Sequence, residues 1–308
     1  MELDVASVIA KNCRSMLEDK DGLILGQCLT AVGWVAGTVP NLPDHPGIIE
    51  LSMADVAGGG IAVGAALNAR KPVVYVIRYQ GFLWYNAISI INYAAKSLEL
   101  FRVPCPLLVR AIASEGFIGP VAGNSHHSLL LRMPGLNVIA PMTPKEWTEA
   151  WEFHFGSNLN PTVLSEHRSS YKINKDFNVY RSAEPQVTIL GISAGRLSAL
   201  TAADQLTQEG INVDLFHLVW LSPLRFPEEY LNSLTKSKFG IIIDSDYESW
   251  GAVQALAFQI MELVPGVIIK VCGLDKKSAG FSKITDNVTP NSDKIIVKIK
   301  NQLNLRGE

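Results

Sequence analysis

Short, continuously apolar segments alternate with segments of helical periodicity along almost the whole chain, and this alternation restricts the fold more than any other feature. The apolar segments have the length of buried strands and lie at 22–27, 48–51, 72–77, 106–113, 137–141, 162–167, 187–193, 213–218, 239–244 and 267–273. Because they do not alternate with polar residues, they predict parallel strands covered on both faces by helices. The chain is therefore predicted to be an α/β protein.

The helical segments follow the same alternation. They are predicted at 4–18, 53–67, 83–100, 143–155, 195–209, 226–235, 250–263 and 291–303. Asp4 and Thr143 have the side chains of N-cap residues, and Pro144 suits the first helical position. A stretch rich in Gly and Pro at 31–47 predicts a surface loop.

One polar, charged stretch interrupts the alternation, at 172–186. Such a composition is typical of an interdomain linker. We predict a first α/β domain at 1–171, the linker at 172–186, and a smaller second α/β domain at 187–308.

Composition excludes several classes of partner. The chain has 308 residues, of which 27 are basic and 29 acidic, and no block of like charge forms a nucleic-acid track or a membrane-surface helix. No uncharged apolar run reaches about 18 residues, and the acidic start MELDVA is unlike a signal peptide. The expected location is the cytoplasm, with no nucleic-acid or membrane partner. Four scattered cysteines without a CxxC pair predict reduced thiols rather than a zinc site.

The segment 53–67, MADVAGGGIAVGAAL, combines one carboxylate, Asp55, with four glycines. Two interpretations are open: a wall against a flat ligand, or a helix whose glycines only permit close packing on the sheet. The spacing does not match G-x-G-x-x-G, because position 63 is Val, and no P-loop is present. A phosphorylated cofactor would need another polypeptide to hold its phosphates.

Two further clusters contain residues that could act in catalysis or in ligand binding. The loop at 119–128 contains His126 and His127 among glycines and small polar residues; a neutral imidazole can donate to a substrate or move a proton near pH 7. The alternative is a pair of exposed loop histidines. Adjacent loop histidines without a third ligand do not form a metal site.

The second cluster is aromatic and comprises Tyr79, Phe82, Trp84 and Tyr85, where the strand at 72–77 passes into a helix. Ligands of parallel sheets bind at this end of a strand, so a flat ring could stack here, with core packing as the alternative. A similar position follows the strand at 162–167, where Glu166 is expected to pair with Arg168.

Five blocks in order, GIAVGAAL, NYAAK, PGLNVIAPMTP, NPTVLSEHRSSY and VDLFHLVWLSPL, resemble one family: the beta subunits of thiamine-diphosphate-dependent 2-oxoacid dehydrogenase first components and the C-terminal halves of transketolases. The resemblance implies a parallel-sheet pyrimidine-binding domain followed by a smaller transketolase-type C-terminal domain. It also implies an enzyme subunit whose cofactor is thiamine diphosphate with Mg²⁺.

The resemblance assigns roles to residues of this chain. Asp55 stands where the family has a catalytic Glu against a ring nitrogen of the aminopyrimidine, and Gln27 replaces a frequent Glu. His126 matches a substrate-contacting histidine. The implied catalytic residues are Asp55, His126 and His127; the implied cofactor-binding residues are Gln27, Asp55, Gly58, Gly59, Phe82 and Tyr85; no metal ligand is assigned to this chain.

The resemblance also implies a partner. The family holds the diphosphate and Mg²⁺ with a GDG motif that this chain lacks, so an alpha subunit should carry it, typically in a heterotetramer of two alpha and two beta chains. The implied reaction is 2-oxo acid decarboxylation with acyl transfer. The alternatives are a split transketolase acting on sugar phosphates, a non-catalytic regulatory paralogue, and an unrelated doubly wound binding protein.

Overall fold

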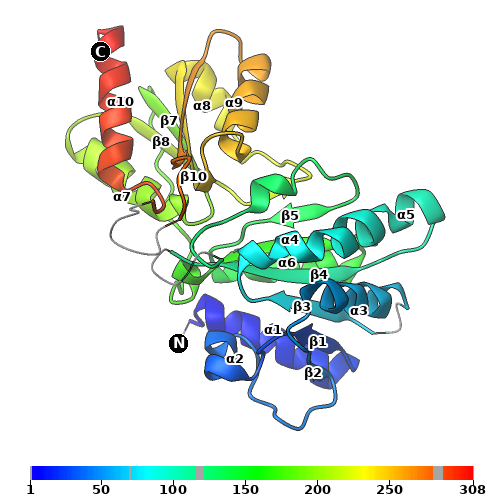
Figure 1. Cartoon of the computed structure of the whole chain (residues 1–308). Coiled ribbons are helices and arrows are strands. Elements are labelled where there is room, and N and C mark those ends of the chain that lie inside the picture. The colour runs from blue at the N-terminus through cyan, green and yellow to red at the C-terminus, as the bar shows by residue number, and fades with distance from the viewer. Residues whose placement is uncertain (1, 69–70, 116–118, 120, 280–286, 308) are drawn as a thin grey trace. The chain divides into compact units, whose positions relative to one another are not determined.

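The computed structural model describes residues 2–68, 71–115, 119, 121–279 and 287–307, and divides into two compact units (Figure 1). Unit 1 comprises 1–114, 129–176 and 221–223, and unit 2 comprises 115–128, 177–220 and 224–308. The division after residue 176 falls inside the stretch predicted as a linker. The histidine-containing residues 121–128 belong to unit 2, although they precede the last strands of the predicted first domain.

Unit 1 is built on a seven-stranded sheet with the order β2-β1-β3-β4-β6-β5-β9. Its strands are β1 (Leu23–Gly26), β2 (Ile48–Glu50), β3 (Val73–Ile77), β4 (Leu107–Ala113), β5 (Asn137–Ile139), β6 (Thr162–His167) and β9 (Trp220–Ser222). The pairs that join β2 through β5 are parallel. Every residue of β3 and β4 is buried, so helices and loops cover both faces of the sheet, as the apolar runs predict.

The helices of unit 1 are α1 (Val5–Lys20), α2 (Ala31–Gly37), α3 (Asp55–Leu67), α4 (Leu83–Ala87), α5 (Ala95–Phe101) and α6 (Pro144–Gly156). Helix α1 packs against α6, and α3 packs against α4 and the segment that follows it. Both predicted N-caps are confirmed. Asp4 accepts from the backbone N–H of Ser7, and Thr143 forms a capping box with Glu146, with Pro144 in the first turn.

Two predicted segments differ from the structure. The stretch predicted as a loop at 31–47 contains α2, and residues 33–37 all have positive φ, which makes this a left-handed turn. The helix predicted at 83–100 is interrupted by the π-helical segment Ile88–Ala94 between α4 and α5. A π segment widens the helix locally and often marks a functional region. Hydrophobic periodicity does not report either feature.

Unit 2 contains a four-stranded parallel sheet with the order β11-β10-β7-β8. Its strands are β7 (Val187–Ile192), β8 (Val213–Leu218), β10 (Phe239–Tyr247) and β11 (Ile268–Leu274), and its helices are α7 (Gly195–Gln208), α8 (Tyr230–Ser237), α9 (Ala252–Leu263) and α10 (Ser292–Arg306). Helices α7 and α10 pack together over one core, in which the side chains of Ile241, Leu206 and Ile299 are fully buried.

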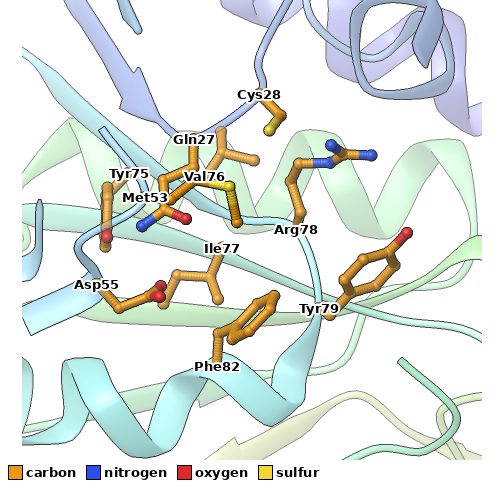
Figure 2. Close-up of a pocket in the computed structure, with 10 residues that line it drawn as sticks. All are labelled: Gln27, Cys28, Met53, Asp55, Tyr75, Val76, Ile77, Arg78, Tyr79 and Phe82. Carbon is orange, nitrogen blue, oxygen red and sulfur yellow. The ribbon is translucent and has the colours of Figure 1, made fainter. Parts of the chain in front are cut away.

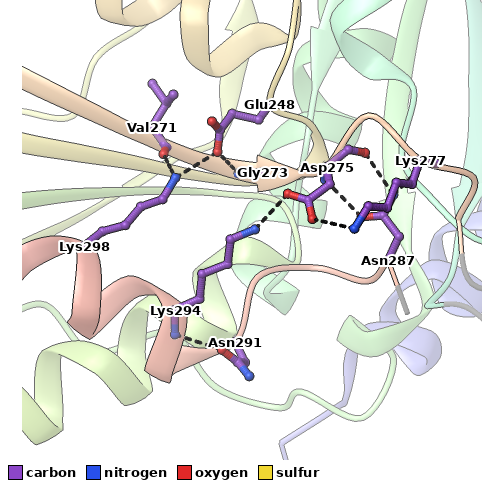
Figure 3. Close-up of polar contacts among 9 residues, drawn as sticks. All are labelled: Glu248, Val271, Gly273, Asp275, Lys277, Asn287, Asn291, Lys294 and Lys298. Atoms are coloured by element: carbon purple, nitrogen blue, oxygen red, sulfur yellow. Dashed lines mark hydrogen bonds and ion pairs between the residues drawn. The ribbon is translucent and has the colours of Figure 1, made fainter. Parts of the chain in front are cut away.

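Polar contacts join α10 to the end of β11 (Figure 3). The Lys298 ammonium donates to Glu248, at 3.0 Å, and to the carbonyl of Val271, at 2.7 Å, while Lys294 pairs with Asp275 at 3.2 Å. The side chain of Asn291 caps the first turn of α10 by accepting from the backbone N–H of Lys294. These contacts place the last helix on the sheet of unit 2.

Candidate active site

The sheet of unit 1 has a topological switch point between β1 and β3. The chain leaves β1 toward β2 on one side and leaves β3 toward β4 on the other, so the two connections diverge at the carboxyl ends of these neighbouring strands. A crevice forms where connections of a parallel sheet diverge in this way, and ligands of such sheets bind there. The fold therefore predicts a site beside the residues that follow β1 and β3.

A pocket occupies this position (Figure 2). It has a cavity volume of about 130 Å³ and is partly open to solvent. Its lining residues come from the ends of β1 and β3, the start of α3 and the turn before α4: Gln27, Cys28, Met53, Asp55, Tyr75, Val76, Ile77, Arg78, Tyr79 and Phe82. Apolar side chains make up most of the wall, and a few polar groups are placed among them.

Asp55 supplies the carboxylate of the pocket. It is the first residue of α3 and is half-buried, and the positive end of the helix dipole favours an anion at this position. Its Oδ1 atom accepts a hydrogen bond of 3.3 Å from the side-chain amide of Asn86 on α4. In Figure 2 the carboxylate points toward the space between Gln27 and Phe82. A ligand that carries a ring nitrogen can therefore meet a fixed oxygen here.

Gln27 supplies a buried amide to the same pocket. The side chain is only 9% exposed, and its Nε2 atom has no hydrogen-bond partner in the described part of the chain. A buried donor without a partner costs free energy unless a ligand or water satisfies it. The pocket thus has an open polar position besides Asp55.

Aromatic side chains stand beside these polar groups. The rings of Tyr79 and Phe82 lie with their centroids 6.2 Å apart, and both line the pocket. Tyr85, which shares the prediction with Phe82, is 57% exposed on α4 and does not line the pocket. Of the two aromatics that sequence reasoning left open, Phe82 lines the pocket and Tyr85 does not.

Gly58 and Gly59 lie on the buried face of α3 and do not line the pocket. A Cβ atom at Gly58 would lie 2.9 Å from the hydroxyl of Tyr75, and one at Gly59 would lie 2.7 Å from Oδ1 of Asn86. These glycines therefore leave room for polar side chains behind Asp55. Helix α3 therefore has both of the features that the sequence left open. Asp55 lines the pocket, and Gly58 and Gly59 lie on the face that packs against Tyr75 and Asn86.

The predicted histidines belong to unit 2. His127 is fully buried, and its Nε2 atom lies 2.8 Å from Oδ2 of Asp244 at the end of β10. Burial favours the neutral imidazole, but the carboxylates of Asp244 and Asp246 outweigh it and raise the pKa of His127 to about 9. His127 is therefore an imidazolium at pH 7, paired with Asp244.

His126 has a different state. It is half-buried, and its ring centroid lies 6.5 Å from that of Tyr247. Burial lowers the pKa of His126 despite the neighbouring carboxylate of Asp246, so this imidazole is neutral at pH 7. Asp246 also accepts from the backbone N–H and the hydroxyl of Ser128. Two adjacent histidines thus differ in charge because their carboxylate neighbours differ.

Sequence reasoning missed several polar residues of these sites. Tyr75 is a polar residue inside an otherwise aliphatic strand, and Asn86 is an amide inside an aromatic helix; either exception could have signalled a buried polar contact. Asp244 and Asp246 follow the apolar run of β10 and were equally visible. The pairing expected between Glu166 and Arg168 is wrong. Glu166 instead binds the Arg110 guanidinium with both oxygens, at 2.8 and 2.9 Å.

Arg168 lies elsewhere, with its guanidinium 5.2 Å from the ring centroid of Tyr79, while Arg78 lies 5.7 Å from the same ring. The Nε atoms of both arginines are buried without a hydrogen-bond partner in the described structure. The ends of β3 and β6 therefore carry two cations around one aromatic ring.

No group of three or more His, Cys, Asp or Glu side chains among the described residues is arranged to hold a metal ion. The four cysteines are free thiols; Cys28 lines the pocket, and the other three are buried. Among the helices that the structure describes, none is long and apolar enough to cross a membrane.

The two units define an α/β enzyme subunit of the transketolase type, and comparison with known families agrees. Residues 2–174 match the transketolase pyrimidine binding domain, and residues 177–295 match the transketolase C-terminal domain. The chain belongs to this family and is a subunit of a thiamine-diphosphate-dependent enzyme, a class that uses Mg²⁺ with the cofactor.

Two curated relatives are beta subunits. The chain is 24% identical to the mitochondrial pyruvate dehydrogenase E1 component subunit beta of Caenorhabditis elegans over 283 residues, covering 84% of this chain and 79% of the relative. It is 25% identical to the beta subunit of acetoin:2,6-dichlorophenolindophenol oxidoreductase of Cupriavidus necator over 236 residues, covering 70% and 67%.

Two solved structures share the fold. A split gene transketolase, described as an inactive beta4 tetramer, has a TM-score of 0.75 at 14% identity and covers 99% of both chains. Transketolase from Campylobacter jejuni has a TM-score of 0.71 at 15% identity; it covers 97% of this chain but only 47% of its own length. This chain therefore corresponds to about half of a single-chain transketolase.

The pocket of unit 1 fits the aminopyrimidine ring of thiamine diphosphate on its own residues. It offers a carboxylate at Asp55, an unsatisfied buried amide at Gln27 and an aromatic face at Phe82. A ring with nitrogen atoms and an exocyclic amino group needs these kinds of group.

Proposed function

We propose that this chain is the pyrimidine-binding beta subunit of a two-chain enzyme that decarboxylates a 2-oxo acid and transfers the acyl group. The observation that carries the proposal is the position of Asp55, a half-buried carboxylate at the switch-point pocket of a pyrimidine-binding domain. The beta subunits among its relatives support the oxo-acid branch.

Asp55 would share a proton with a ring nitrogen of the aminopyrimidine, and the ring would lie against the apolar wall formed by Met53, Val76 and Ile77. Phe82 would hold the ring by its face, and the Gln27 amide would complete its polar contacts. Thiamine diphosphate, when bound, supplies a nucleophilic carbon for attack on the carbonyl of the oxo acid. The task of this chain is to orient the ring and to hold the proton at Asp55.

His126 is proposed to act on the substrate, because a neutral imidazole can both donate and accept a proton. The roles of the two histidines are therefore separated. His127 is fully buried in an ion pair, so we assign it a supporting role in which its contact with Asp244 fixes the loop that carries His126.

The partner is proposed to be an alpha subunit that carries the diphosphate- and Mg²⁺-binding domain, in a heterotetramer of two alpha and two beta chains. The chain corresponds to 47% of the C. jejuni transketolase, and we assign the other half to the partner. Helix α3, which packs against α4 and the π segment, exposes several large apolar side chains together with α4, the π segment and α5: Val56, Ile61, Leu67, Trp84, Tyr85, Ile88, Tyr93, Leu100 and Phe101. Exposed apolar side chains on neighbouring elements support a subunit interface there.

A split transketolase is the second candidate, favoured by the two arginines around Tyr79. Their unsatisfied Nε atoms suit an anionic substrate group, and a sugar phosphate carries more charge than a 2-oxo acid. In that case the alpha–beta complex would transfer ketol units between sugar phosphates.

The experiment is copurification of the chain with a candidate alpha subunit, followed by assays with 2-oxo acids and with sugar phosphates. If the complex releases carbon dioxide from 2-oxo acids and does not act on sugar phosphates, the result supports the proposed function, because ketol transfer releases no carbon dioxide. Ketol transfer without carbon dioxide supports the second candidate. Binding of thiamine diphosphate without either activity would indicate a regulatory paralogue, and absence of binding by the complex would refute the proposal.

A further inference from the structure

We infer that Asn86 is a positioning residue that holds the Asp55 carboxylate in place for the aminopyrimidine ring, with Tyr75 holding Asn86 in turn; this inference rests on the proposed function. Asn86 and Tyr75 are buried, at 0% and 1% exposure; Asn86 contacts the Asp55 carboxylate, and Tyr75 contacts Asn86. The three side chains come from β3, α4 and the start of α3, so the contacts join three separate elements.

The orientation of the Asn86 amide follows from its neighbours. Its Nδ2 atom lies 3.0 Å from the carbonyl oxygen of Phe82 and 3.3 Å from Oδ1 of Asp55. Both are acceptors, so the amide nitrogen must face them and the amide oxygen must face the Tyr75 hydroxyl, 2.8 Å away. Burial, together with the nearby Asp55, raises the pKa of the Tyr75 phenol, which keeps the hydroxyl protonated and donating. The two hydrogen bonds, which we call the relay, therefore have a determined direction: Tyr75 donates to Asn86, and Asn86 donates to Asp55.

The glycines of α3 make the relay possible. A Cβ atom at position 59 would lie 2.7 Å from the Asn86 amide oxygen, and one at position 58 would lie 2.9 Å from the Tyr75 hydroxyl. Both contacts are too short for any side chain, although glycine in a helix interior is unfavourable relative to alanine. The helix keeps these two glycines despite their unfavourable helix propensity, which supports a role for the polar contact behind the carboxylate.

The relay constrains the short side chain of Asp55. Asn86 binds Oδ1 of Asp55, and no contact in the described structure engages Oδ2. One oxygen is therefore fixed by the protein, and the other is the atom left for the ring nitrogen. Aspartate has fewer rotatable bonds than glutamate, so a single donor behind it is sufficient to fix the direction of the second oxygen.

The test measures recognition of the ring nitrogen by binding. The complex of this chain with its alpha subunit is titrated, in the presence of Mg²⁺, with thiamine diphosphate and with an analogue in which the ring nitrogen facing the carboxylate is replaced by C–H. The ratio of the two dissociation constants reports the contact between Asp55 and that nitrogen. The variants are Asn86→Ala and Tyr75→Phe, and the control is Asn92→Ala, an exposed asparagine whose side chain contacts Lys96.

We expect the wild-type complex to prefer thiamine diphosphate by about tenfold or more, the increment of one charge-assisted hydrogen bond. Asn86→Ala should lower this preference by about tenfold, and Tyr75→Phe by a smaller factor, while Asn92→Ala leaves it unchanged. Equal weakening of both ligands in Asn86→Ala would overturn the inference, because that result reflects a merely structural role.

The outcomes separate the inference from the proposed function. If the wild-type complex binds neither ligand, or binds both equally, the proposed contact of Asp55 with the ring nitrogen fails, and the proposed function fails with it. If the wild type prefers thiamine diphosphate and Asn86→Ala keeps that preference, only the positioning role fails. If Asn86→Ala does not fold, Tyr75→Phe decides, since it removes one hydroxyl and leaves the amide in place. An unchanged preference in Tyr75→Phe then refutes the relay.

Discussion

The imidazole of His127 and the carboxylate of Asp244 form a fully buried ion pair, with 2.8 Å between Nε2 and Oδ2. The pair connects the histidine loop to the end of β10 within unit 2. It explains why one of two adjacent histidines is charged at neutral pH while the other is neutral.

The first prediction concerns pH. Because the folded-state pKa of His127 is about 9, above the unfolded value of 6.5, the folded state binds the proton more tightly. The stabilisation is fully present below pH 6.5 and is lost as the pH rises from there through 9. Urea unfolding of the isolated chain between pH 6 and pH 9.5 measures this loss.

The matched control removes the charges of both partners. A double variant, His127→Asn with Asp244→Asn, should unfold with a free energy that is nearly constant over the same pH range. A wild-type stability that does not fall between pH 7 and pH 9 would show that His127 is not a charged partner of Asp244.

The second prediction concerns the buried pair of Arg110 and Glu166, both fully inaccessible to solvent. Glu166→Gln keeps the shape but leaves the Arg110 charge unpaired, so it should lower the free energy of unfolding by about 3 kcal/mol or more. The control is Arg14→Ala, which breaks the half-exposed pair with Glu18 on α1 and should cost less than about 1 kcal/mol. Similar costs for both variants, measured by urea unfolding, would contradict the assignment.

The third prediction compares two glycines of α3. A Cβ at position 64 meets no atom within 4 Å, whereas one at position 59 lies 2.7 Å from the amide oxygen of Asn86. In the isolated chain Gly64→Ala should therefore stabilise by up to about 1 kcal/mol through helix propensity. Gly59→Ala should destabilise by about 1–3 kcal/mol because the relay must shift. If thermal unfolding shows that both substitutions stabilise, the packing around Asn86 is looser than the structure indicates.

Much of this organisation could be predicted from the sequence. Continuous apolar runs such as β3 and β4 report burial on both faces directly, and Asp4 and Thr143 report helix starts through local hydrogen bonds. Phe82 was predicted because it follows a strand at the end of the sheet where ligands bind, and Asp55 because it is the one carboxylate at the head of the glycine run; Gln27 was assigned through the resemblance alone.

The remainder depends on contacts between residues distant in sequence. The partner of Glu166 is Arg110, 56 residues earlier and on the neighbouring strand, rather than Arg168 two positions away. The role of Gly58 and Gly59 depends on side chains of β3 and α4, and the position of His127 and Ser128 in unit 2 depends on Asp244 and Asp246. Periodicity contains no information about such pairs.

The central claim is that this chain presents the Asp55 carboxylate to the pyrimidine ring of thiamine diphosphate. The most direct measurement is titration of the alpha–beta complex with thiamine diphosphate and Mg²⁺, for the wild type and for Asp55→Ala, together with turnover of a 2-oxo acid. We predict saturable binding by the wild type, binding weakened about tenfold in Asp55→Ala, and turnover reduced by about a hundredfold or more. Binding and turnover equal to those of the wild type in a folded Asp55→Ala complex would contradict the account.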